Sequence, residues 1–216
     1  MMIFYTVAVS NYCAKVELVL ALKGIEADHR SPPGGYGGDS YKAIVPTGTV
    51  PALVDDDLVL SESESINEYL EEQHPNPALL PRDLKERAST RMLSRFHDLK
   101  VEPLIRALFK HMTPSQRQES VILEKHQELN LQLSMLDQIG RFAPYVAGDK
   151  ISLADCGFAP TLLLAKMMFE TVEQPLILSD KMSRWHDQIL QHPLAKPVLI
   201  KYSAAVNDWL SLKLSS

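Results

Sequence analysis

The apolar positions of the N-terminal third of the chain predict short strands separated by helices. Residues 2–7 form a compact apolar run that predicts a strand. Residues 15–22 are nearly all apolar and stop before Gly24, so they predict a helix that is buried on most sides. The remaining expected elements are a strand over 26–29, a short helix over 41–44, strands over 51–54 and 58–60 around a turn at 55–57, and a helix ending at residue 73.

The order of these elements is a βαβ unit followed by a ββα unit. This order is the arrangement of a thioredoxin-like α/β domain. The loop over residues 31–40 contains four glycines and two prolines. Because these glycines do not lead from a strand into a helix at phosphate-binding spacing, we interpret the loop as a flexible connector near a ligand mouth and exclude a dinucleotide site.

Beyond residue 73 the apolar spacing is helical. We expect a thioredoxin-like domain over 1–76, a linker over 77–84 and an all-α helical bundle over 85–216. The predicted helices cover 84–111 with an interruption near Pro103, 115–140 with Val121, Leu129, Leu133 and Leu136 on one side, 153–169 with a bend at Pro160, 179–191, and 194–210. Ser152 and Asp155 fit a capping box, which is a folding element, and Cys156 beside it is expected to be inert core.

Composition narrows the function without naming it. The 22 basic and 27 acidic residues give a net charge of −5, so nucleic acid is not expected as a partner. No apolar run reaches transmembrane length, and no membrane association is expected. Two cysteines do not form a disulfide framework, which favours a reduced, cytoplasmic compartment. The seven histidines are scattered, so no metal site is expected.

The segment from Val50 to Ile66 is the strongest candidate for a binding site. Pro51 begins a strand, which suits a cis peptide bond that turns the backbone of Val50 outward to pair with an extended peptide. After the hairpin, Ser61 with Glu64 and Ser65 with Glu68 each fit a capping box. The helix N-terminus suits a bound carboxylate, and Glu62 can pair with an ammonium group. The alternative is an ordinary strand start and helix cap.

Ser10 and Cys13 lie between the first predicted strand and the first predicted helix. A thiolate at that helix N-terminus is stabilised by the helix dipole, and a hydroxyl that donates to sulfur lowers the thiol pKa further. Ser10 can therefore activate a thiol, or it can simply cap the helix. Cys13 can itself be a redox-active thiol, or it can be a buried residue of the first helical turn.

These motifs together resemble cytosolic glutathione transferases over essentially the whole chain. Val50-Pro51-Ala52-Leu53 resembles the V-P-x-L motif of that family, and Glu62 to Ile66 resembles its E/Q-S-x-A/S-I turn. Ser10-x-x-Cys13-x-x-Val16 is similar to serine-type members of bacterial, theta-, delta- or zeta-like classes. Pro77-x-Leu79-Leu80-Pro81 resembles the interdomain connector of the family. Ala14 stands where an arginine often follows the cysteine.

The resemblance implies that Ser10 is the catalytic residue, with Cys13 and Tyr5 as alternatives; Tyr5 lies near the tyrosine of tyrosine-type classes. It implies that Val50, at the cis-proline Pro51, binds the cysteinyl backbone of glutathione, and that Glu62 and Ser63 bind its γ-glutamyl end. Residues considered for the second-substrate pocket are Tyr12, Phe109, His111 and Met112.

The resemblance implies that the protein transfers glutathione, its co-substrate, to a small hydrophobic electrophile. It also implies a cytoplasmic homodimer with a role in detoxification that needs no metal. Two alternatives stay open. One is a glutathione-dependent isomerase of the maleylacetoacetate type. The other is a non-catalytic regulatory protein of the stringent-starvation type.

Overall fold

Four short strands form the sheet of the N-terminal domain in the computed structural model, which describes residues 1–216. The spatial order is β2-β1-β3-β4, with β1 parallel to β2 and antiparallel to β3, and β3 antiparallel to β4. The bounds are β1 Ile3–Tyr5, β2 Asp28–Arg30, β3 Ala52–Asp55 and β4 Leu58–Ser61. With the helices α1 (Asn11–Lys23), α2 (Asp39–Lys42) and α3 (Ser63–Gln73), this sheet confirms the predicted thioredoxin-like domain.

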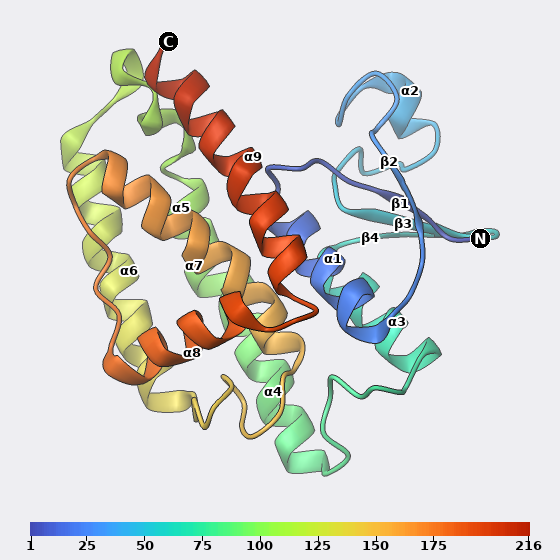
Figure 1. Ribbon diagram of the computed structural model, residues 1–216. Coiled ribbons are helices and arrows are strands. Elements are labelled where there is room, and N and C mark those ends of the chain that lie inside the picture. The colour runs from blue at the N-terminus through green and yellow to red at the C-terminus, as the bar shows by residue number, and fades with distance from the viewer.

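Helix α1 lies at the centre of the molecule, between the sheet and the helical domain (Figure 1). It packs against α3 within its own domain and against α7 and α9 of the helical domain. Gly24 ends it with a left-handed conformation at φ 65°, as expected for a glycine stop. Most of its side chains are buried, which confirms the prediction from its almost unbroken apolar sequence.

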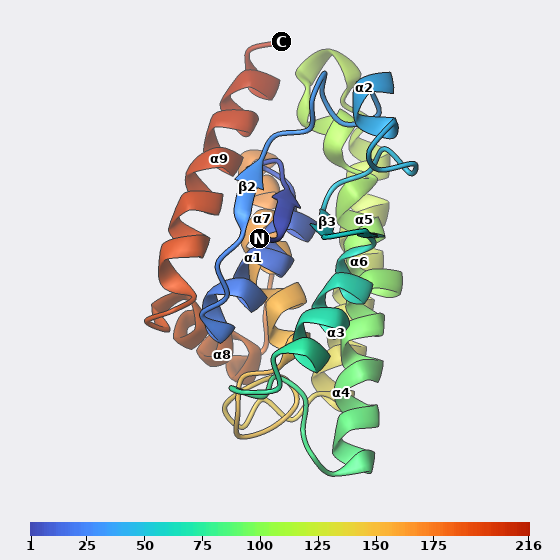
Figure 2. The same ribbon diagram turned by 90° about the vertical axis from the view of Figure 1, so that its right-hand side faces the viewer.

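The second domain is all-helical, as predicted, and α9 and α4 lie on opposite sides of α1 and α3 in the perpendicular view (Figure 2). Residues 74–83 contain no helix or strand, and the linker proposed for 77–84 overlaps this interval. The elements are α4 Leu84–Phe96, a π-helix over His97–Val101, α5 Glu102–Arg106, 3₁₀ turns over Phe109–Met112 and Pro114–Gln116, α6 Glu119–Ile139, α7 Leu153–Thr171, α8 Asp180–Gln191 and α9 Lys196–Leu214.

The interruption expected near Pro103 takes the form of the π-helix that precedes it. Proline cannot donate a backbone hydrogen bond to residue i−4, here Leu99, and its ring crowds that carbonyl. The wider π-turn is a known way to accommodate such a break inside a helix. The expected helix start at Ser115 was too early, because a 3₁₀ turn precedes α6. Ile122 is buried on its inner face, whereas Val121 is only half-buried.

The two capping boxes predicted around Glu62 do not form. Glu62 itself is the N-cap of α3, and no side chain makes a capping hydrogen bond there. Ser61 is the last residue of β4. The carboxylate of Glu64 turns to Lys15 at 2.6 Å, and Glu68 accepts from Arg91 Nε at 2.8 Å. Long-range partners therefore outcompete the local caps.

The capping box at the start of α7 does form. Asp155 accepts from the backbone N–H of Ser152 at 2.8 Å, and it also accepts from the backbone of Val146 at 3.0 Å and from Trp185 Nε1 at 2.7 Å. Cys156 beside it is 1% exposed, and burial raises its thiol pKa, as expected for inert core.

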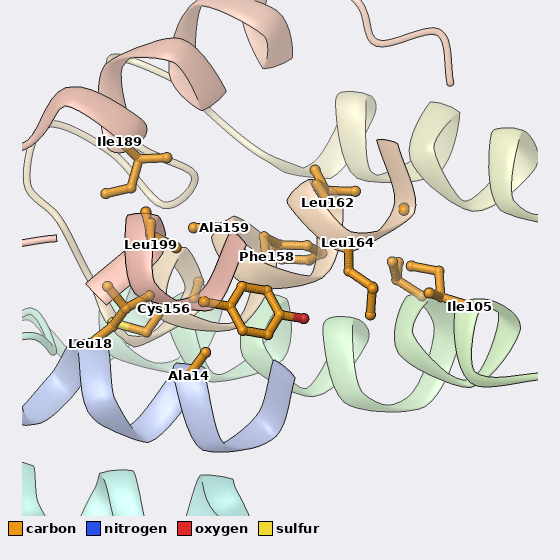
Figure 3. Close-up of a cluster of buried hydrophobic side chains, with 14 of the residues drawn as sticks. Ala14, Leu18, Ile105, Cys156, Phe158, Ala159, Leu162, Leu164, Ile189 and Leu199 are labelled. Atoms are coloured by element: carbon orange, nitrogen blue, oxygen red, sulfur yellow. The ribbon is translucent and has the colours of Figure 1, made fainter. Parts of the chain in front are cut away.

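One large hydrophobic core runs through both domains. Around α7 it joins residues of α1, α5, α8 and α9 (Figure 3). Ala14 and Leu18 of α1 contribute to it from the N-terminal side. A small second cluster under α2 contains Tyr5, Tyr41, Val45 and Ala52. Because the main core is continuous, the position of α1 and of the residues at its N-terminus is fixed relative to both domains.

Candidate functional site

A cavity of about 850 Å³ opens between the two domains at the N-terminus of α1. It is lined by 20 residues. Those from the N-terminal domain are Val7, Val9, Ser10, Asn11, Tyr12, Tyr36, Thr49, Val50, Pro51, Glu62, Ser63, Glu64 and Ser65. Those from the helical domain are Arg95, Asp98, Leu99, Arg106, Phe109, Leu164 and Trp209. The residues predicted for glutathione therefore share one cavity with the primary catalytic candidate, Ser10.

Ser10 is the N-cap of α1 and is half-buried at the cavity wall. Its Oγ accepts a hydrogen bond from the backbone N–H of Cys13 at 3.2 Å. This bond uses an oxygen lone pair, so the hydroxyl hydrogen stays available to a ligand. The capping role and the thiol-activating role, which were alternatives in the sequence, are thus compatible.

Cys13 and Tyr5 lie outside the cavity lining. Cys13 is 1% exposed, its sulfur accepts from the backbone N–H of Val7 at 3.5 Å, and burial raises its pKa. A thiol that is buried and favours its neutral form is a poor nucleophile. Tyr5 is buried in the small cluster, edge-on to Tyr41 with ring centroids 5.2 Å apart. Both side chains have the surroundings of packing residues.

The Val50–Pro51 peptide is cis, as expected from the sequence. The Val50 N–H and C=O make no hydrogen bond within the protein, so both remain free to pair with an extended ligand backbone. At the same end of the β3–β4 hairpin, Ser63 is the first residue of α3. Its position at a helix N-terminus combines a hydroxyl with free backbone N–H groups, which suits a carboxylate.

Glu62 has an unusual backbone conformation, with φ 76° and ψ 111°. A non-glycine residue in this region carries a strain of about 1–3 kcal/mol, and such strain is concentrated at functional sites. The side chain is exposed in the cavity. The conformation holds a free carboxylate beside the α3 N-terminus, where it can meet an ammonium group.

A buried ion cluster that the sequence analysis missed lies at the cavity wall. Lys15 is 0% exposed, and its Nζ lies 2.6 Å from Glu64 Oε2 and 2.9 Å from Asp98 Oδ1. Ser94 donates its hydroxyl to Glu64 Oε2 at 2.8 Å. Burial by itself raises the pKa of Asp98, but the hydrogen bond from His97 and the charge of Lys15 outweigh it and lower that pKa to about 2.

His97 connects this cluster, through Thr161 of α7, to Asn11 at the start of α1. Its Nδ1 lies 2.8 Å from Asp98 Oδ1, and its Nε2 lies 2.8 Å from Thr161 Oγ1. Because ionised Asp98 only accepts, Nδ1 carries the proton and Nε2 accepts from Thr161. Asn11 in turn donates to Thr161 Oγ1 at 3.0 Å. A Cβ at Gly157 would lie 2.9 Å from His97 Nδ1, so glycine is required there for the ring to fit.

Two of the four residues considered for the second-substrate pocket line the cavity. These are Tyr12 and Phe109, joined by Leu99, Leu164 and Trp209. The other two, His111 and Met112, are buried away from it at 1% and 0% exposure. Phe109 and Trp209 meet edge-on with centroids 5.2 Å apart. Beside the charged Arg95, Asp98 and Arg106, the helical wall of the cavity therefore has an apolar and aromatic part, which suits a hydrophobic ligand.

Family models match both domains. Residues 4–78 match the glutathione S-transferase N-terminal domain, and residues 96–193 match the C-terminal domain. A glutathione S-transferase of Pseudomonas putida is 34% identical over 176 residues, which are 80% of this chain and 79% of that protein. This chain belongs to the glutathione S-transferase family. The family resemblance and the fold expected from the sequence are both confirmed.

Other relatives show how broad this glutathione S-transferase family is. A stringent starvation protein A homolog of Coxiella burnetii is 31% identical over 167 residues, 74% of each chain. A theta-class glutathione S-transferase of Xanthomonas axonopodis pv. citri, solved with glutathione bound, has the same fold with a TM-score of 0.76 and 21% identity, covering 92% of this chain and 97% of that one. In the glutathione S-transferase fold of this chain, no helix is long and apolar enough to span a membrane.

Proposed function

We propose that this protein is a glutathione transferase that activates the glutathione thiol with Ser10 and adds it to a small electrophile. The observation that carries the proposal is the available hydroxyl hydrogen of Ser10 at the N-terminus of α1, in the same cavity as Val50, Glu62 and Ser63. A thiol activator and groups suited to both ends of a peptide-like ligand are therefore combined in one place.

Glutathione binding uses the polar side of the cavity. The Glu62 carboxylate pairs with the ammonium of the γ-glutamyl group, while Ser63 and the N-terminus of α3 pair with its carboxylate. The free N–H and C=O of Val50 pair with the backbone of the cysteinyl residue. This orientation brings the sulfur to Ser10 and leaves the aromatic wall for the electrophile.

The chemistry is nucleophilic attack by the thiolate. Ser10 donates its hydroxyl hydrogen to sulfur, and the dipole of α1 adds to this stabilisation of the anion. A hydrogen bond to a charged acceptor is worth about 1.5–3 kcal/mol. This energy corresponds to a lowering of the thiol pKa by roughly one to two units from about 8.5.

The test is the pH profile of the variant Ser10→Ala. Glutathione affinity should stay within about threefold, kcat at neutral pH should fall, and the apparent kinetic pKa should rise by about one to two units. Because the variant also loses the cap of α1, about 0.5–2 kcal/mol of stability, the folded fraction is measured in parallel. Ser10→Thr, which keeps a hydroxyl, should retain most of the activity.

The comparison variants are Cys13→Ala and Tyr5→Phe, which should leave the pH profile nearly unchanged. If Cys13→Ala abolishes turnover and Ser10→Ala does not, the assignment of Ser10 is wrong, and the protein performs thiol–disulfide chemistry from Cys13. Glutathione must also be consumed in proportion to product, since a glutathione-dependent isomerase would return it unchanged.

A second candidate function is favoured by the likeness to the stringent starvation protein A homolog. It is a regulatory protein of the same fold that does not turn over glutathione. Retention on immobilised glutathione, with release by the free peptide, supports the transferase proposal. Failure to bind glutathione, with the folded state verified by circular dichroism, would favour the regulatory alternative.

A further inference from the structure

Arg106 is the one cation of α5 at the cavity wall, and the proposed thiol chemistry does not use it. Its side chain is 49% exposed. The guanidinium lies 5.2 Å from the centroid of the Tyr12 ring and 5.4 Å from that of the Phe109 ring. These two stacking contacts hold a delocalised cation inside an otherwise apolar and aromatic part of the cavity.

Buried Glu102 fixes the orientation of this guanidinium. Glu102 is 2% exposed and accepts from Arg106 Nε at 3.2 Å and from Arg106 Nη2. Tyr12 donates to the same carboxylate at 2.9 Å, and Asn11 Nδ2 donates at 3.3 Å. Its oxygens are thus fully engaged from α1 and α5, and Glu102 is shielded from a ligand in the cavity.

One end of the guanidinium remains free. Nε and Nη2 are held by Glu102 and Asn11, whereas Nη1 donates to no protein atom. A cation fixed on one edge and unpaired on the other is prearranged for an anionic acceptor that enters from the cavity. The guanidinium suits carboxylate and phosphate oxygens alike. Of the two groups, the carboxylate is the planar one, and it can lie in the plane of an aromatic or conjugated body between the aromatic side chains.

We infer that the electrophile of this protein is a planar conjugated or aromatic molecule that carries a carboxylate, bound by Arg106 Nη1. That this ligand reacts as an electrophile rests on the proposed function. That it is planar and carries a carboxylate rests on the residues of the cavity. Phe109 and Trp209 contact the planar body of the ligand, and Leu99 and Leu164 complete the apolar surface. Arg106 thereby determines which electrophiles are accepted.

A binding experiment with unreactive ring compounds tests the anion site without catalysis. The probes are 3-nitrobenzoate and 3-nitrobenzamide, which differ in charge on the same ring, and calorimetry measures their affinities. The wild-type protein should bind the benzoate at least tenfold more tightly than the amide. Arg106→Met should remove this difference, and Arg106→Lys should retain part of it.

Two further variants separate recognition from folding. Arg106→Met leaves Glu102 buried without its main partner, so Arg106→Met/Glu102→Gln removes both charges and should also lose the preference. Arg141→Met removes an arginine outside the cavity, 58% exposed and 3.3 Å from Glu86, and should keep it. Equal wild-type binding of both probes, or a preference that survives in the double variant, would overturn the inference.

A kinetic experiment connects the site to the proposed reaction. The substrates are 4-chloro-3-nitrobenzoate and its primary amide; the thiolate forms a C–S bond at the ring carbon, and chloride leaves with the bonding electron pair. For each substrate, kcat/KM is divided by the rate constant of the uncatalysed reaction. In the wild-type protein this ratio should be about tenfold higher for the acid than for the amide, and Arg106→Met should lower kcat/KM for the acid alone. If both substrates lose activity equally, Arg106 is structural and the inference fails. Charge-dependent binding without glutathione turnover would instead support the Arg106 site and reject the transferase proposal.

Discussion

Replacement of Lys15 by methionine is the most informative perturbation of this fold, because it removes one cation from between two buried carboxylates. Lys15 is 0% exposed, and its ammonium contacts Glu64 and both oxygens of Asp98 at 2.6, 2.9 and 3.1 Å. Methionine fills a similar volume, so the change deletes the charge with little loss of packing. The Glu64 carboxylate is then left without its counter-ion, and Asp98 keeps only the hydrogen bond from His97 and the exposed Arg95, 3.4 Å away.

The expected cost is about 3–5 kcal/mol, which is typical when one partner of a buried ion pair is removed. The pKa of Asp98 gives an independent scale. Its value of about 2, against an ordinary 3.8, means that His97 and Lys15 together stabilise the native ionised form by about 2–3 kcal/mol beyond the cost of burial. Glu64 loses its ion-pair partner as well, so the total loss of stability in Lys15→Met should exceed the contribution of Asp98 alone.

The pH dependence provides a second measurement of the same cluster. Since the native pKa of Asp98 is depressed, its stabilising contribution is present above pH 4 and is lost as the pH falls from about 4 to about 2. Burial also lowers the pKa of His97, so the unfolded chain binds the additional proton below about pH 6.5 and stability falls with pH there too. Without the charge of Lys15, the pKa of native Asp98 should be less depressed, so the free energy of unfolding of Lys15→Met should depend less on pH between about 4 and about 2.

The assay is urea unfolding followed by the fluorescence of Trp185 and Trp209, at one fixed protein concentration because association would add to stability. Lys125→Met is the matched control: its ammonium pairs with Glu124 and Glu128 at 2.9 Å on the surface of α6, and it should cost at most about 1 kcal/mol. The triple variant Lys15→Met/Glu64→Gln/Asp98→Asn should recover more than half of the loss. A cost below about 1 kcal/mol for Lys15→Met, or no recovery in the triple variant, would refute the electrostatic explanation.

Two further predictions concern the glutathione end of the cavity and the assembly. Glu62→Gly and Glu62→Ala should both weaken glutathione binding tenfold or more, about 1.4 kcal/mol. The glycine variant should be about 1 kcal/mol more stable than the alanine variant, because glycine adopts a φ of 76° without strain. Unchanged glutathione affinity in calorimetry would contradict the contact between Glu62 and the ammonium group. The chain should form a homodimer, as the family resemblance implies. Light scattering at micromolar concentration should then give twice 24.2 kDa, and a mass of 24.2 kDa would reject the dimer.

Elements with local signals were predictable from the sequence. The glycine stop of α1, the hairpin turn between β3 and β4, and the Ser152–Asp155 box of α7 each depend on residues within a few positions of one another. The capping boxes at Ser61 and Ser65 had equally good local patterns and failed. The difference is that Glu64 and Glu68 have stronger partners elsewhere, Lys15 and Arg91, whose distance along the chain hides them from a local pattern.

Lys15 shows where such prediction ends. A lysine at the start of a helix that is otherwise almost entirely apolar is itself a signal, because a buried ammonium is stable only when it is paired. The sequence could therefore indicate that an acidic partner exists, but not which of the 27 acidic residues it is. The partners come from α3 and from the π-helix that Pro103 helps to create, 83 positions away in the case of Asp98. The helix break expected from Pro103 and the buried charge of Lys15 are thus parts of one arrangement, which only the packing of both domains around α1 reveals.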